Sequence, residues 1–136
     1  MGAVRPEAPR DESLPREHRL RSRGDYLHCY RRGRRKGGRY ATLFFVPNPL
    51  PHPRLGITAS RKVGKRAVDR QRLKRRVREI YRRWDHRTQL PSIDLVVNLK
   101  PEAKAAGFDE FRSALERQLS KLLPGDPQQQ REGPSR

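Results

Sequence analysis

The chain has 136 residues, of which 33 are Lys or Arg and 15 are Asp or Glu, so its formal net charge is +18. That length suits one domain, and a hydrophobic share of only 32% predicts a small core. No apolar stretch approaches the ~20 residues that a membrane-spanning helix needs, and the charge favours a polyanionic partner, which would relieve self-repulsion and release its condensed counterions.

The two ends of the chain are predicted to be disordered, and the middle is predicted to form a single domain. Residues 1–13 are rich in proline and charge, and residues 124–136 have no apolar periodicity. The domain is therefore expected over residues 14–123. The N-terminal segment lacks the apolar stretch of a signal peptide, and Cys29 has no second cysteine to pair with, so we expect a cytoplasmic protein.

A first helix is predicted to begin at Ser22. Ser22 and Asp25 have the spacing of a helix-capping pair. Tyr26 and Tyr30 follow one turn apart, and Gly33 is expected to end the helix in a left-handed conformation.

Two β segments come next. Residues 39–46 are rich in β-branched and aromatic side chains and run up to Pro47. The basic tract at 36–39 could start this strand early and divide it in two around the glycines. In residues 54–60, apolar and other side chains alternate, which places on one face Leu55, Ile57 and Ala59.

The second half of the chain predicts a helix, a strand and a helix. Residues 68–87 have helical periodicity, and residues 93–99 form a short apolar run that suits a buried strand. Residues 108–122 predict an amphipathic helix with, at helical spacing, Phe108, Phe111, Leu115, Leu119 and Leu122. The order α-β-β-β-α-β-α indicates an α+β sandwich, in which helices pack on a mixed four-stranded sheet.

The helix predicted at 68–87 has two opposed sides. At 100° per residue, an apolar stripe falls within about 60° and contains Leu73, Val77, Ile80 and Trp84. The opposite side carries Gln71, Arg75, Arg78 and Arg82. A flanking row contains Arg72, Arg76 and Arg83 and is interrupted by Glu79.

The charge on this helix is unbalanced. From Lys65 to Arg83 there are ten basic residues, whereas the only acids are Asp69 and Glu79. A solvated helix face normally carries charges of both signs, because like charges one turn apart repel. Arginine also engages phosphate in a planar, two-pronged way. The pattern therefore favours nucleic acid as the partner, without distinguishing RNA from DNA.

Segment 60–79, which follows an apolar strand, resembles the signature of the bacterial ribonuclease P protein family. That signature has an Arg-Asn-Arg core followed by Lys-Arg and a further Arg, and here it reads Arg70-Gln71-Arg72, Lys74-Arg75 and Arg78. Gln71 departs from the usual Asn and changes the reach of that amide. The resemblance extends over about 14–123 and implies a left-handed β-α-β crossover in a ribosomal protein S5 domain 2-like fold, although topology alone would favour the right-handed form.

The resemblance implies two RNA-binding sites. The basic helix would dock on the RNA subunit through Lys65, Arg66, Arg70, Gln71, Arg72, Lys74, Arg75, Arg78 and Arg82. A cleft between the first helix and the sheet would hold the single-stranded 5′ leader of precursor tRNA through Tyr26, Tyr30, Phe44, Thr58, Arg61, Lys62 and Asn98. Stacking of an unpaired base on an aromatic ring contributes ~1–3 kcal/mol. The alternative is that Tyr26, Tyr30 and Phe44 simply complete the core.

The sequence offers no catalytic apparatus of its own. The histidines lack paired metal-ligand spacing, and the acids do not cluster as a two-metal nuclease requires. The resemblance therefore implies an enzyme subunit whose partner RNA cleaves the phosphodiester, with Mg²⁺ bound chiefly by the RNA subunit and the substrate. The implied partners are ribonuclease P RNA and precursor tRNA, with no membrane and no obligate protein partner.

Two other functions remain open from the residues. A ribosomal protein would explain the charge, but it has no use for an aromatic cleft that binds single strands. A DNA-binding protein would lay the basic helix in a major groove, and such proteins are usually dimers. No dimerisation heptad is visible in the sequence.

Overall fold

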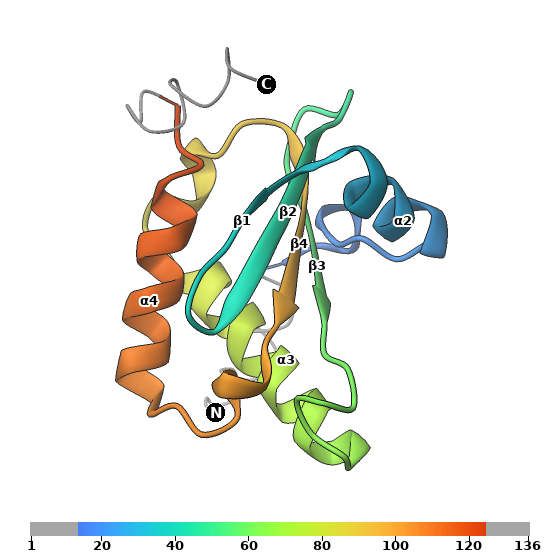
Figure 1. Ribbon diagram of the computed structural model, residues 1–136. Helices are drawn as coiled ribbons and strands as arrows, with labels where there is room; N and C mark the ends of the chain where they lie inside the picture. The colour runs from blue at the N-terminus through green and yellow to red at the C-terminus, as the bar shows by residue number, and fades with distance from the viewer. Residues whose placement is uncertain (1–13, 125–136) are drawn as a thin grey trace, which may run out of the picture.

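The computed structural model describes residues 14–124 of the chain (Figure 1). The terminal segments predicted to be disordered, 1–13 and 124–136, lie outside the described residues apart from Pro124. The main elements in chain order are α2 (Arg23–Arg32), β1 (Arg34–Lys36), β2 (Ala41–Pro47), β3 (Arg54–Thr58), α3 (Ala67–Arg83), β4 (Ile93–Leu99) and α4 (Phe108–Ser120). The predicted element order is therefore confirmed.

The four strands form one mixed sheet in the order β1-β2-β4-β3. The apolar strand β4 lies in the interior of the sheet, antiparallel to β2 and parallel to β3. Strands β1 and β2 are antiparallel neighbours separated by residues 37–40, so the predicted division around Gly37 and Gly38 is confirmed. Strand β3 ends at Thr58, two residues before the predicted end at Ser60.

The two faces of the sheet are covered unequally. Figure 1 views the sheet nearly edge-on, with α4 on one side and α2 on the other. On the first side α3 and α4 enclose the main core, where the largest fully buried side chains include Leu43, Leu95 and Phe111. On the other side the short helix α2 covers a small cluster around Cys29 and Val96. Helix α2 therefore covers only part of that face.

Helix α2 begins as predicted but ends differently. The Ser22 hydroxyl accepts a hydrogen bond from the Asp25 backbone N–H at 3.1 Å, which satisfies one of the free donors of the first turn. Gly33 follows the helix, but its φ of −81° is not left-handed, so that prediction was wrong. A Cβ at Gly33 would lie 2.4 Å from the Cys29 carbonyl oxygen and 2.8 Å from that of Phe45. Glycine is needed here for space and not for its conformational freedom.

Helix α3 is shorter at its C-terminus than predicted. It ends at Arg83, because Trp84 adopts an extended backbone and directs its ring into the core. A short 3₁₀ helix at Arg87–Gln89 replaces the expected last turn. Among residues 14–124, no helix is long and apolar enough to cross a membrane.

Helix α4 has the predicted apolar stripe with one exception. Phe111, Leu115 and Leu119 are buried, whereas Phe108 is 47% exposed at the first position of the helix. The stripe also includes a polar residue that the periodicity did not reveal. Buried Gln118 donates from its amide nitrogen to the carbonyl oxygens of Lys36 and Ala41, both at 3.0 Å. It thereby ties α4 to the edge of the sheet.

Candidate nucleic-acid interface

The apolar stripe of α3 faces the core. Leu73, Val77, Ile80 and Trp84 are all buried, as the periodicity predicted, and Tyr81 is buried beside them. Burial raises the pKa of the Tyr81 hydroxyl to about 12. Since one side of the helix is fixed against the sheet, the opposite side is directed outward.

The carboxylates of α3 neutralise the ends of the helix and leave its middle positive. Asp69 forms ion pairs with Arg66 at 3.3 Å and Arg72 at 3.7 Å. The hydrogen bond from Arg66 holds the pKa of Asp69 below its usual value. Glu79 contacts Arg82 at 2.8 Å and Arg83 at 3.4 Å.

Between these clusters, Gln71 and Arg75 are exposed, and Lys74 is half-buried. Within the described part of the chain, none of the three side chains forms an ion pair. This stretch of α3 therefore presents hydrogen-bond donors and positive charge to any polyanion that approaches.

Arg70 and Arg82 differ from the other predicted docking residues. Arg70 donates to the backbone carbonyls of Gly64 at 2.8 Å and Lys65 at 3.0 Å, which fixes the loop before α3. The side chain of Arg82 is only 17% exposed and pairs with Glu79. The prediction that Arg82 shares the exposed side of the helix was wrong: its side chain is mostly covered by the fold, whereas that of the next residue, Arg83, is 74% exposed.

On the α2 side of the sheet, four of the predicted cleft residues come together from four elements. Thr58 of β3 lies opposite Asn98 of β4 in the strand register. The Asn98 amide donates to the Thr58 hydroxyl at 3.0 Å and to the Tyr30 hydroxyl at 3.2 Å, and the two hydroxyls are 3.0 Å apart. This network fixes the end of the Tyr30 side chain over the uncovered part of the sheet.

Phe44 completes this group. Its ring meets the ring of Tyr30 edge to face, with centroids 4.8 Å apart, and the guanidinium of Arg35 lies 5.5 Å from its centroid. Both rings are half-buried, so each packs against the fold and also retains solvent-accessible surface. Within one small area the structure thus provides aromatic surface, a cation and a polar network.

Tyr26 is packed more tightly against the sheet. Its ring lies over Gly56 of β3, where an added Cβ would come within 2.5 Å of the ring. Its hydroxyl donates to the carbonyl oxygen of Leu20 at 3.4 Å, and burial raises its pKa. Tyr26 therefore has a role in holding α2 against β3.

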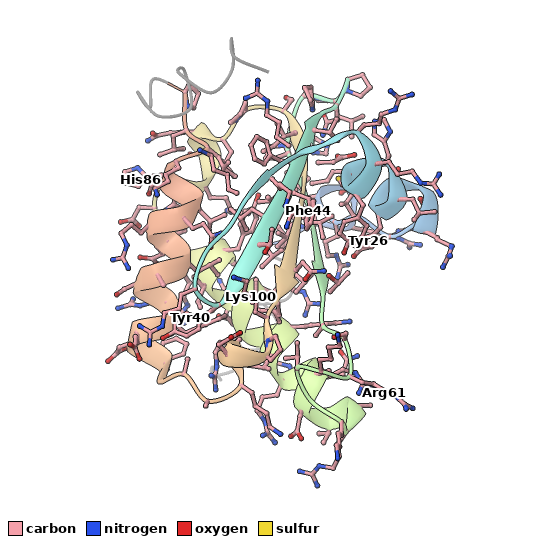
Figure 2. All side chains as sticks on the ribbon, in the orientation of Figure 1. Tyr26, Tyr40, Phe44, Arg61, His86 and Lys100 are labelled. Carbon is pink, nitrogen blue, oxygen red and sulfur yellow. The ribbon has the colours of Figure 1, made fainter. Side chains whose placement is uncertain are left out.

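The two predicted cations of the cleft, Arg61 and Lys62, follow β3 in the chain. Both are exposed in the turn between β3 and α3. Figure 2 shows Arg61 in that turn, away from Tyr26 and Phe44. The structure therefore brings together the aromatic, Thr and Asn members of the predicted cleft, but not Arg61.

A buried ion pair that the sequence did not reveal positions α2. Asp94 lies within the apolar run of β4, and its side chain is only 5% exposed. The Arg54 guanidinium donates to both of its oxygens, at 2.8 and 2.7 Å, and the Asn48 amide donates to the same carboxylate at 2.9 Å. Arg54 also contacts Asp25 of α2 at 3.5 Å. The sequence contained one sign of this ion pair, which is the single acid in the mostly apolar strand β4. A carboxylate buried there needs a partner that donates hydrogen bonds.

Comparison with known proteins identifies the family. The family model for ribonuclease P matches residues 14–123. The chain belongs to the ribonuclease P protein family. The ribonuclease P protein component of Desulfovibrio desulfuricans is 42% identical over 120 residues, which cover 82% of this chain and 90% of that relative. That of Methylococcus capsulatus is 37% identical over 113 residues, which cover 83% and 87% of the two chains.

Solved structures of ribonuclease P proteins share the fold. The Staphylococcus aureus protein has a TM-score of 0.70 at 28% identity, and the match covers 78% of this chain and 97% of that one. The Thermotoga maritima protein has a TM-score of 0.65 at 34% identity, with coverage of 76% and 94%. The predicted α+β fold class, with helices on a mixed four-stranded sheet, is confirmed.

The titratable residues of this ribonuclease P protein do not form a metal centre in the described range. Among residues 14–124, no three His, Cys, Asp or Glu side chains are grouped closely enough to hold an ion. Two of the scattered histidines, His18 and His52, stack on each other with ring centroids 4.0 Å apart. Desolvation lowers the pKa of His18, and His52 and Arg87 lower it further.

We predict that Cys29 resists thiol reagents until the protein unfolds. The thiol is fully buried between α2, to which Cys29 belongs, and strand β4, and desolvation raises its pKa from 9.0 to about 12, with smaller contributions from Asp94 and Asp25. Labelling with a maleimide near pH 8 should be slow in the native protein and fast in denaturant, since only the exposed thiolate reacts. Rapid native labelling would contradict this packing. The variant Gln71→Cys provides an exposed reference thiol in the same chain.

The same pKa shift predicts lower stability in alkali. Between pH 9 and about 12 the unfolded thiol ionises while the folded thiol keeps its proton. The unfolded state then binds fewer protons, so the free energy of unfolding falls as pH rises through this window. The variant Cys29→Ala should lose this part of the pH dependence.

Proposed function

We propose that this chain docks on ribonuclease P RNA through α3 and holds the 5′ leader of precursor tRNA on the α2 side of the sheet. The observation that carries the proposal is that α3 buries its apolar stripe and leaves Gln71, Lys74 and Arg75 accessible between its two ion-pair clusters. The reaction assigned to the complex is endonucleolytic removal of the leader from precursor tRNA.

The docking face is the exposed stretch of α3 with the loop before it. Charge neutralisation on folded RNA favours a surface where guanidinium groups are accessible and not already paired. Arg75 and Lys74 fit that description, and the exposed amide of Gln71 lies on the same side. The other proposed docking residues are Lys65, Arg66, Arg72 and Arg78. Arg66 and Arg72 pair with Asp69, but their side chains are 74% and 62% exposed, so each can also contact a phosphate. Arg70 and Arg82 support this surface from within the fold, through Gly64 and Glu79 respectively.

The leader site is the group formed by Tyr30, Phe44, Thr58 and Asn98. Unpaired nucleotides bind to aromatic surfaces flanked by cations, because every base has a face that can stack. Tyr30 and Phe44 provide the rings and Arg35 provides a cation over one of them. The hydroxyl and amide groups can exchange hydrogen bonds with base edges or with sugar hydroxyls.

The proposed division of labour leaves the chemistry to the RNA. Mg²⁺ would be bound chiefly by the RNA subunit and the substrate, where it can activate water and stabilise the leaving oxygen. The protein would reduce the repulsion between phosphates, retain the leader and support the active conformation of the RNA. The expected compartment is the bacterial cytoplasm, where both RNAs are present. The family assignment does not favour a ribosomal or a DNA-binding role.

Replacing Arg75 with Ala is predicted to weaken binding of ribonuclease P RNA. The slope of log K against log salt should become shallower by up to about one unit, because one phosphate contact is lost. The matched control is Arg31→Ala, which removes the same charge from an exposed position on α2. Filter binding over a series of salt concentrations measures both variants. Equal slopes for the two variants would exclude α3 as the docking face.

Replacing Tyr30 or Phe44 with Ala is predicted to weaken binding of leader-bearing precursor tRNA much more than that of mature tRNA. Each ring would stack on at least one base, which contributes ~1–3 kcal/mol. Tyr30→Phe is the matched variant, because it keeps the ring and removes only the hydroxyl that contacts Thr58 and Asn98. Holoenzyme affinities for both tRNAs provide the measurement. Equal losses for the two ligands would remove the leader site from this surface.

A further inference from the structure

A second basic surface lies between α3 and α4, on the other side of the sheet from Tyr30 and Phe44. Two hollows, of about 470 and 530 Å³, adjoin at Arg83, Arg112 and Glu116, and together they are called the groove below. The arginines that line it are Arg72, Arg75, Arg76, Arg83, Arg112 and Arg117. Most of the α3 members belong to the flanking row of the basic helix. Of that row, only Arg72 belongs to the proposed docking face, and none belongs to the leader site.

The groove has a net positive charge. Its carboxylates are Glu79, Asp85 and Glu116, so six arginines face three acids. Glu79 is already paired with Arg82 and Arg83. Arg72 pairs with Asp69. The other four arginines also line this concave surface, where a polyanion can contact several of them at once.

One end of the groove contains an aromatic residue that the fold does not bury. Phe108 is 47% exposed, and with Val68 it is one of two large apolar side chains so exposed among residues 14–124. The Arg76 guanidinium lies 5.6 Å from the centroid of its ring. Helical spacing would place Phe108 in the core stripe of α4. Its exposure beside Ile80 and Arg112 instead gives the groove an apolar wall.

We propose that the groove between α3 and α4 binds unpaired nucleotides of ribonuclease P RNA, with one base stacked on Phe108. The arginines would contact the flanking phosphates, as in other single-strand sites that combine cations with an aromatic ring. This inference rests on the proposed function, because it takes the RNA that docks on α3 as the occupant. The groove adjoins that face and is separated by the sheet from the leader site, so the RNA subunit is the RNA within reach.

Substitutions at Phe108 test the proposal without disturbing the core. Phe108→Leu keeps apolar surface but removes the ring, whereas Phe108→Tyr keeps the ring. Phe108→Leu should weaken binding of ribonuclease P RNA to the full chain by about fivefold or more, which is the lower end of what one stacked base contributes. Phe108→Tyr should bind like the unmodified protein. Wild-type affinity for Phe108→Leu would overturn the proposal, and so would equal losses in the two variants.

A photocrosslink identifies the occupant. With p-benzoylphenylalanine in place of Phe108, irradiation of the holoenzyme bound to precursor tRNA should crosslink unpaired nucleotides of ribonuclease P RNA. Crosslinks to the precursor alone, to base-paired segments alone, or to no RNA would overturn the proposal. The variant Lys74→Ala separates the two hypotheses, because Lys74 belongs to the docking face and does not line the groove. If it weakens RNA binding while Phe108→Leu does not, the docking face stands and the groove fails, and if neither does, both fail.

Discussion

The packing of one side of α3 against the sheet determines how this protein presents its charge. Leu73, Val77, Ile80 and Trp84 are buried together, and this leaves the helix no freedom to rotate about its axis. Gln71 and Arg75, on the opposite side, then face outward, whatever the cost of repulsion among the basic residues around them. A chain with a net charge of +18 would relieve that repulsion by binding a polyanion. The same packing directs the flanking row of arginines toward α4, where they line the groove.

The unequal covering of the sheet gives the protein its second surface. Two helices close one face, but α2 is short and closes only part of the other. The buried contact of Arg54 with Asp94, extended to Asp25, fixes α2 at one end of that face. Gly56 allows the Tyr26 ring to lie directly on β3. The part of the sheet that α2 does not cover remains partly open to solvent. Tyr30, Phe44, Thr58 and Asn98 meet there.

Periodicity was sufficient to predict the elements and the two sides of α3. An apolar stripe over about three turns has few alternative placements. A short strand that is apolar except for Asp94 and Asn98, as β4 is, belongs in the interior of a sheet. The resemblance then assigned Tyr30, Phe44, Thr58 and Asn98 to one cleft, and the structure brings these residues together. Their side-chain contacts could not be predicted from periodicity, because they depend on the strand register.

The errors arose where tertiary contacts override local pattern. Phe108 has core spacing, but the first turn of α4 extends beyond the sheet and leaves it exposed. Arg82 has the spacing of the exposed side, yet the fold encloses it at the end of α3. Gly33 is required because two carbonyl oxygens approach it, which no local signal reveals. The pairing of Asp94 with Arg54 spans 40 residues and depends on the parallel register of β3 and β4.

Site-directed cleavage of RNA tests most directly whether α3 docks on ribonuclease P RNA. Buried Cys29 leaves an introduced cysteine as the only reactive thiol in the described chain, so an iron chelate can be attached at Gln71→Cys alone. In the assembled complex, radicals from that position should cleave ribonuclease P RNA at a few neighbouring sites, and the same chelate at Arg31→Cys on α2 should not cleave those sites. The same cleavage pattern from both positions, or no cleavage of ribonuclease P RNA from position 71, would contradict the account.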